Sequence, residues 1–155
     1  MKVIFLDVDG VLNCQSSKSK CGAFIGIDDA KVKRLRQIVD ATGAKIVLSS
    51  SWKHGWEPVH KEDQKSDADY LDRKLRRGGL RAIDKTSEAA SQYRGEGIIA
   101  WVSAHNVDRF IILDDEWFDF KEVGLSSRVV KTEFYDDNGG LTDEGVELAI
   151  ALLNA

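Results

Sequence analysis

The chain has 155 residues, a length typical of one domain that buries roughly two-thirds of the surface its unfolded form would expose. With 43% hydrophobic and 31% charged residues its composition is ordinary for a globular protein, and a net charge of -4 excludes general affinity for nucleic acids or membranes. The two cysteines, Cys14 and Cys21, form no metal-thiolate pattern, and the short apolar run after Lys2 is neither a signal peptide nor a membrane span. We therefore expect a cytoplasmic protein with reduced thiols, one domain over residues 1–155 and no membrane partner.

The first element is a run of β-favouring apolar residues that ends at two carboxylates. Residues 2–6 predict a strand, and Asp7, Asp9 and Gly10 follow it directly. If the strand ends at Asp7, the loop after it can fold both carboxylates around one point. The carboxyl ends of strands are where open α/β sheets build their sites, so these residues are the first candidates for function.

A loop and a helix come next. Residues 14–26 are rich in Ser, Lys and Gly without a period, which predicts a surface loop. If this loop covers the strand end, Lys18 and Lys20 would face an anionic substrate; a solvated loop with incidental charge is an equally good interpretation. Asp28 can begin a helix and Gly43 can end it. Its apolar positions recur at helical spacing, at Val32, Leu35, Ile38 and Val39.

The middle of the chain alternates again between strand and helix patterns. Residues 45–48 predict a buried parallel strand that ends in three serines and Trp52. Residues 53–66 contain the single proline and predict an irregular connection. A helix over 69–77 and a weak third strand over 80–84 follow, and then a polar segment. The whole stretch from 53 to 94 leaves room for a small lid at most.

The last third completes the alternation. After Arg94, a helix face is formed by Ile98, Trp101, Val102 and His105. Residues 109–113 predict a strand that ends in Asp114-Asp115, and 128–132 predict a short edge strand. A turn over 137–140 leads to a final helix capped by Thr142. Strands that alternate with helices imply an α/β fold, a doubly wound central parallel sheet between helical layers.

The acids predict a cation site at one edge of this sheet. Because parallel strands end at the same edge, Asp7, Asp9, Asp114 and Asp115 should converge. Four carboxylates in one cleft would raise one another's pKa unless a cation lay among them, and an all-oxygen set suits Mg²⁺. Such an ion usually completes its shell with water and substrate phosphate.

A phosphate beside these carboxylates predicts phosphoryl transfer. One carboxylate can attack phosphorus in line while a second protonates the leaving oxygen and later activates water; Asp7 and Asp9 are placed to divide those roles. The charge that develops on the phosphoryl oxygens needs donors, for which Ser50 and Arg94 are the candidates.

These motifs resemble those of a known family. Residues 7–13 are similar to the first signature of the haloacid dehalogenase (HAD) superfamily of phosphohydrolases, and the later signatures match in order at the serines 49–51, at Arg94 and at residues 113–115. Ser-Ser-Trp after the second strand, Arg-Gly-x-Glu from Arg94 and Gly-Leu-Thr at 140–142 resemble the small capless type found in some RNA-repair proteins.

The resemblance implies roles and a topology. It implies that Asp7 is the nucleophile, that Asp9 is the general acid and base and a backbone ligand of Mg²⁺, and that Asp114, with Asp115, binds the metal. It also implies a Rossmann-like sheet with strand order 5-4-1-2-3.

The second signature has an uncertain register. Three consecutive serines, Ser49, Ser50 and Ser51, could supply its hydroxyl, and Ser50 is preferred because a small or apolar residue usually precedes the functional one. We expect Gly10, Ser51 and Trp52 to contact the substrate. Trp52 and Trp117 each follow a signature and could stack on a base or ring of the substrate. The alternative for both is packing in the core, where tryptophans are found more often.

Two further choices stay open. The cation of the third signature is usually Lys, so Lys85 and Lys53 are alternatives to Arg94. Asp119 is an alternative to Asp115, because an acid a few residues after the pair also fits the family pattern.

The leading hypothesis is a Mg²⁺-dependent phosphatase that forms a phosphoaspartate on Asp7. Since the sequence leaves no room for a large cap, the open site suits a macromolecular phosphate such as a nucleic-acid end. The alternatives are a receiver-type phosphoacceptor module and a non-catalytic HAD-like binding domain. A receiver would need its phosphorylated Asp after the third strand, and a binding domain would not need the pair Asp7 and Asp9.

Overall fold

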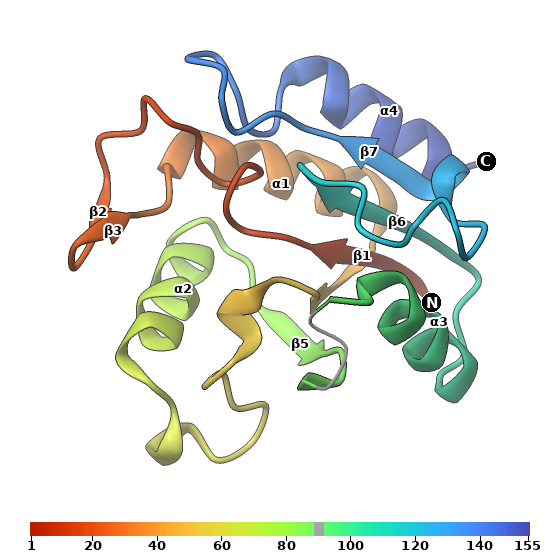
Figure 1. Ribbon diagram of the computed structural model, residues 1–155, viewed down its shortest axis with the longest axis horizontal. Helices are drawn as coiled ribbons and strands as arrows, with labels where there is room; N and C mark the ends of the chain where they lie inside the picture. Colours follow the sequence, from red (N-terminus) through yellow and green to blue (C-terminus); the bar gives the residue numbers. More distant parts are fainter. Residues whose placement is uncertain (89–91) are drawn as a thin grey trace.

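The computed structural model describes residues 1–88 and 92–155, and its centre is a five-stranded parallel sheet (Figure 1). The strands are β1 (Lys2–Leu6), β4 (Lys45–Leu48), β5 (Ala82–Lys85), β6 (Arg109–Asp114) and β7 (Val129–Lys131). Their order is β5-β4-β1-β6-β7 and every pairing is parallel. When these five strands alone are numbered along the chain and read from β7, the order is 5-4-1-2-3, so the predicted α/β fold is confirmed.

Helices cover both faces of this sheet. The helices α1 (Asp29–Thr42), α2 (Ser66–Arg77) and α4 (Asp143–Leu153) contribute to one hydrophobic cluster, and α3 (Arg94–Ala104) contributes to the other. Alternate residues of β1 enter the two clusters: Ile4 and Leu6 point to the first, and Val3 and Phe5 to the second. The central strand is therefore buried on both sides, which explains its continuous apolar run.

The ends of the helices follow the local signals in the sequence. Helix α1 begins after Asp28 and ends at Gly43, whose φ of 72° is the left-handed conformation that glycine allows. Helix α4 begins after Thr142, whose hydroxyl accepts a hydrogen bond from the backbone N–H of Gly145. The side chain of Asp28 makes no such cap bond and instead binds Ser17 and Lys31.

Some elements differ from the prediction. The loop 14–26 contains an antiparallel hairpin of β2 (Lys20–Cys21) and β3 (Phe24–Ile25), whose strands are too short to carry an alternating pattern. Helix α2 begins three residues earlier than predicted, and β5 lies slightly later than 80–84. Short 3₁₀ helices occupy Ser51–Lys53, Lys61–Asp63 and Ser126–Arg128. The predicted polar segment after β5 includes residues 89–91, which lie outside the described residues.

Across the described parts of the chain, every helix is too short or too polar to cross a bilayer.

Candidate active site

The carboxyl ends of the two central strands bring three acids together. Leu6 of β1 pairs with Leu113 of β6, so Asp7 and Asp114 follow adjacent positions, and the backbone N–H of Asp7 donates to the Leu113 carbonyl (3.0 Å). Asp7 and Asp114 are buried and Asp115 is half-buried. One carboxylate oxygen from each of the three lies within 4.8 Å of the others. Of the four acids predicted to converge at this sheet edge, three are thus grouped, although Asp7 lies more than a hundred positions from the other two.

Burial and mutual repulsion raise the pKa values of two of these acids, Asp114 and Asp115. Burial, followed by the charge of Asp7, raises the pKa of Asp114 to about 8. Burial also raises the pKa of Asp115 to about 7, with further contributions from its hydrogen bond to Asp7 and from the charge of Asp7. A cation among the three oxygens would oppose this repulsion. The all-oxygen donor set is the kind that hard divalent ions prefer, so these residues fit Mg²⁺.

Arg94 is the cation that contacts this acid cluster. It lies in the first turn of α3 and is only 8% exposed. Its Nη1 lies 3.0 Å from Asp7 Oδ1 and 2.8 Å from Asp114 Oδ2. Burial would lower the pKa of Arg94, but the two carboxylates outweigh it and the net shift is upward. A buried guanidinium between two carboxylates holds both in fixed orientations.

The two alternative cations have other partners. Lys53 is buried, and its Nζ donates to Thr86 Oγ1 (3.0 Å) and to the Ser87 carbonyl (2.9 Å). Burial and then the nearby Arg94 lower the pKa of Lys53 to about 8. Lys85 donates to the carbonyls of Lys53 and Trp56 and pairs with Glu88. Both lysines therefore brace the segment around β5.

The serines after β4 occupy different surroundings. Ser49 Oγ is buried without a hydrogen-bond partner among the described residues. Ser50 is buried, and its Oγ accepts from the backbone N–H of Trp52 (3.1 Å), which leaves its own O–H able to donate. Ser51 is exposed and lines the cleft. Ser50 as the phosphate donor and Ser51 as a substrate contact stay predictions.

Asp9 is held apart from the three-acid cluster. It is exposed, its Oδ1 accepts from Asn13 Nδ2 (2.9 Å), and its Oδ2 accepts from Trp52 Nε1 (3.0 Å). Its carboxylate is therefore oriented at the cleft but does not join the grouped oxygens of the other acids. The backbone metal contact implied for Asp9 stays a prediction. Trp52 lines the cleft, whereas Trp117 packs against the second hydrophobic cluster with Lys121 Nζ 4.4 Å from its ring centroid.

Gly10 and Asp119 have structural roles. Gly10 has a φ of 85°, and a Cβ at this position would lie 2.5 Å from Asp115 Cβ and Oδ2. Glycine is therefore required for Asp115 to approach the loop; direct contact of Gly10 with substrate stays a prediction. Asp119 accepts from the backbone N–H groups of Gly95 (2.6 Å) and Glu96 (3.1 Å). It thus caps the start of α3, which leaves Asp115 as the acid beside Asp7.

A cleft of about 650 Å³ opens over these residues. Asp7, Asp9, Arg94 and Asp115 line it together with aromatic side chains that no sequence motif singled out: Phe24, Phe118, Phe134 and Tyr135. Phe118 has a φ of 43°, unusual for a residue other than glycine, and its ring centre lies 4.2 Å from Arg94 Cζ. These aromatics lie in segments without a regular period, so no pattern distinguished them.

A comparison with protein families agrees with this geometry. Residues 3–146 match the family described as the HAD domain in Swiss Army Knife RNA repair proteins. The chain belongs to this HAD family. The match covers the five strands of the parallel sheet, except for the first residue of β1, and includes the acid cluster at their carboxyl ends. Searches of curated proteins and of solved structures return no match.

Proposed function

We propose that this HAD domain is a Mg²⁺-dependent phosphomonoesterase that acts through a phosphoaspartate on Asp7 and takes its phosphate from a nucleic-acid end. The observation that carries the proposal is the placement of Asp7. Its carboxylate contacts Arg94 on one side, lies beside Asp114 and Asp115 on the other, and lines an open cleft. The family takes its description from RNA repair proteins, which supports a nucleic-acid substrate.

The first half of the reaction uses two carboxylates. An oxygen of Asp7 attacks phosphorus in line, so that a new O–P bond forms as the ester O–P bond breaks. Asp9 gives a proton to the departing oxygen, which leaves as an alcohol. Arg94, fixed against Asp7, is placed to bind the equatorial phosphoryl oxygens as charge develops on them.

The second half restores the free acid. Asp9 removes a proton from a water molecule, which attacks phosphorus, and the bond between phosphorus and Asp7 breaks to release inorganic phosphate. Asp7, Asp114 and Asp115 would hold Mg²⁺, which supplies positive charge against the carboxylates and the phosphate. Trp52 and Asn13 donate to the two oxygens of Asp9 and so aim this side chain at the cleft.

The test is phosphate release from p-nitrophenyl phosphate and from 5′- and 3′-phosphorylated oligonucleotides, with Mg²⁺ and with EDTA. We expect Mg²⁺-dependent turnover that is lost in Asp7→Asn and retained in Asp63→Asn, an exposed acid outside the cleft. Folded, Mg²⁺-binding protein that hydrolyses none of these substrates would refute the proposal and favour a binding domain.

A further inference from the structure

Two of the aromatic side chains on the cleft are exposed to an unusual degree. Phe24 is 76% exposed and Tyr135 is 82% exposed, and neither belongs to a hydrophobic cluster of the described residues. Both are large side chains left in solvent, and exposed apolar surface of this kind commonly marks the place where a ligand binds. Both residues line the same cleft as Asp7, so a ligand that reaches the acid can also cover these rings.

The loop that precedes the hairpin of Phe24 is joined by hydrogen bonds to the segment that carries Tyr135. Phe24 lies in β3. The ring of Tyr135 packs edge-to-face against that of Phe134, with 5.0 Å between the ring centroids. The backbone N–H of Gln15, in the loop before the hairpin, donates to the Phe134 carbonyl (2.9 Å). The next residue of this loop, Ser16, donates from its hydroxyl to the Asp137 carbonyl (2.7 Å).

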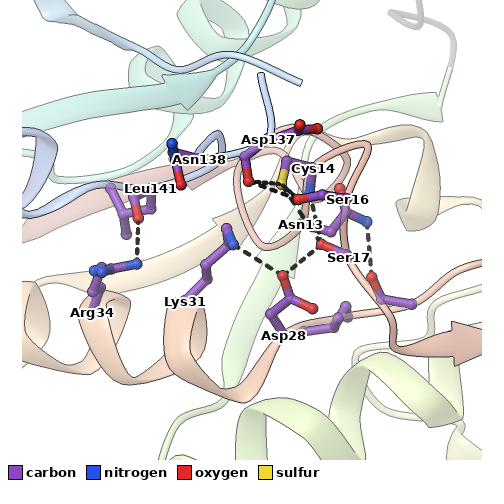
Figure 2. A network of polar contacts seen from close by, with 12 residues as sticks. Asn13, Cys14, Ser16, Ser17, Asp28, Lys31, Arg34, Asp137, Asn138 and Leu141 are labelled. Atoms are coloured by element: carbon purple, nitrogen blue, oxygen red, sulfur yellow. Dashed lines mark hydrogen bonds and ion pairs between the residues drawn. The ribbon is translucent and has the colours of Figure 1, made fainter. Parts of the chain in front are cut away.

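The rest of this network anchors the loop to the core (Figure 2). Cys14 Sγ lies 3.2 Å from Ser16 Oγ, and Ser17 Oγ donates to Asp28 Oδ2 (2.5 Å), which also accepts from Lys31 Nζ (3.0 Å). The loop before the hairpin and the segment of Tyr135 are thus fixed to each other and to the start of α1. Rings on fixed supports lose little further freedom when a ligand stacks on them.

The charges that line the cleft do not suit a long phosphate backbone. Arg94 is the one cation among the described residues that line it, and two of the three carboxylates of the acid cluster already contact its guanidinium. Asp9, Asp67 and Glu116 add negative charge to the same surface. Phosphates beyond the one that reacts would find few partners, whereas a planar base can stack on any aromatic face.

We infer that the cleft binds the terminal nucleotide of a single strand by stacking its base on Phe24 and Tyr135, with few contacts to the phosphate backbone. This inference rests on the proposed function, because it names what holds the nucleotide whose phosphate Asp7 attacks. It has two consequences. Removal of the rings should weaken binding of substrates that carry a terminal base, and binding should depend only weakly on salt.

The first experiment compares substrates with and without the terminal base. Oligonucleotides phosphorylated at the 5′ or 3′ end are offered with a normal or an abasic terminal nucleotide. The native protein should have about a 10-fold lower KM for the base-bearing substrate, the usual scale for one stacked base. In Phe24→Leu/Tyr135→Leu this preference should disappear. Val59→Ala, an exposed apolar control outside the cleft, should keep the preference.

The second experiment does not require turnover. Fluorescence anisotropy of labelled oligonucleotides with Asp7→Asn measures affinity as a function of salt. Each phosphate contact of a single strand adds about 0.7 to the slope of log affinity against log salt, so we expect a slope below about 1. Equal affinity for base-bearing and abasic strands, a steep salt dependence, or a preference for phosphopeptides would overturn the inference. If the native protein released no phosphate but binding still depended on the terminal base, the proposed function would be refuted and the inference on stacking would stand.

Discussion

Replacement of Arg94 by methionine tests whether the buried guanidinium balances the charge of the acid cluster. Arg94, Asp7 and Asp114 are 8%, 4% and 0% exposed, so the variant leaves two buried carboxylates without their cation. Removal of one partner from a buried ion pair costs about 3 to 5 kcal/mol of the free energy of unfolding. The matched control is Arg36→Met, which breaks the exposed pair between Arg36 and Asp40 and should cost about 0.5 kcal/mol.

The assay is urea unfolding at pH 7.5, first in EDTA and then in excess Mg²⁺. In EDTA we expect the large loss for Arg94→Met and the small one for Arg36→Met. Mg²⁺ that binds only the folded protein at 100 times its Kd adds about 2.7 kcal/mol, and it should therefore recover part of the loss in Arg94→Met. Equal losses for the two variants in EDTA would refute the assignment of Arg94 as the counter-charge. A loss that Mg²⁺ leaves unchanged would refute the metal site.

Three further predictions concern the acids and their supports. The folded protein binds protons at Asp114 and Asp115 more tightly than the unfolded chain, with pKa values of about 8 and about 7 against 3.8. In EDTA, the contribution of these two groups to the free energy of unfolding is therefore full below pH 3.8 and is lost as the pH rises toward 8. Urea unfolding from pH 5 to 8.5 should show that the gain in the free energy of unfolding on addition of Mg²⁺ grows with pH. A gain that stays constant with pH would contradict this. Gly10→Ala should lower the free energy of unfolding by about 1 to 3 kcal/mol and weaken Mg²⁺ binding measured by calorimetry. The control is Gly22→Ala, because Gly22 also has a positive φ (60°) but a Cβ there would meet no atom within 4 Å, so Mg²⁺ binding should not change. Equal Mg²⁺ affinities for the two variants would count against the steric argument. Asp119→Ala should cost about 1 kcal/mol through loss of the α3 cap and keep native Mg²⁺ affinity, and a lost affinity would identify Asp119 as a ligand instead.

The regular elements were predictable because their signals are local. The apolar run of β1 stops where the carboxylates begin, and α1 lies between Asp28 and Gly43 as the capping residues indicate. Thr142 likewise begins α4. These signals depend on side-chain spacing and backbone preferences within a few residues, so they can be read without knowledge of the fold.

The choice of residues within the site was less predictable. Lys53, Lys85 and Arg94 are all basic residues of the middle segment, and the sequence left them as alternatives. Only the packing of α3 against the sheet brings the guanidinium of Arg94 to Asp7. Asp119 fitted a metal-site pattern, yet its carboxylate faces the N–H groups at the start of α3. The direction of a side chain depends on such neighbours, and spacing along the chain does not supply it.

The sequence pattern was enough to predict that strands alternate with helices and that acids lie at the carboxyl ends of two strands. Since parallel strands end at one sheet edge, that pattern already implied that Asp7 and Asp114 would meet. Only the folded chain shows that Trp52 holds Asp9 apart from the three-acid cluster, and that Phe24 and Tyr135 line the same cleft as Asp7. These residues lie mostly in loops, whose paths depend on hydrogen bonds between residues distant in sequence rather than on any local period.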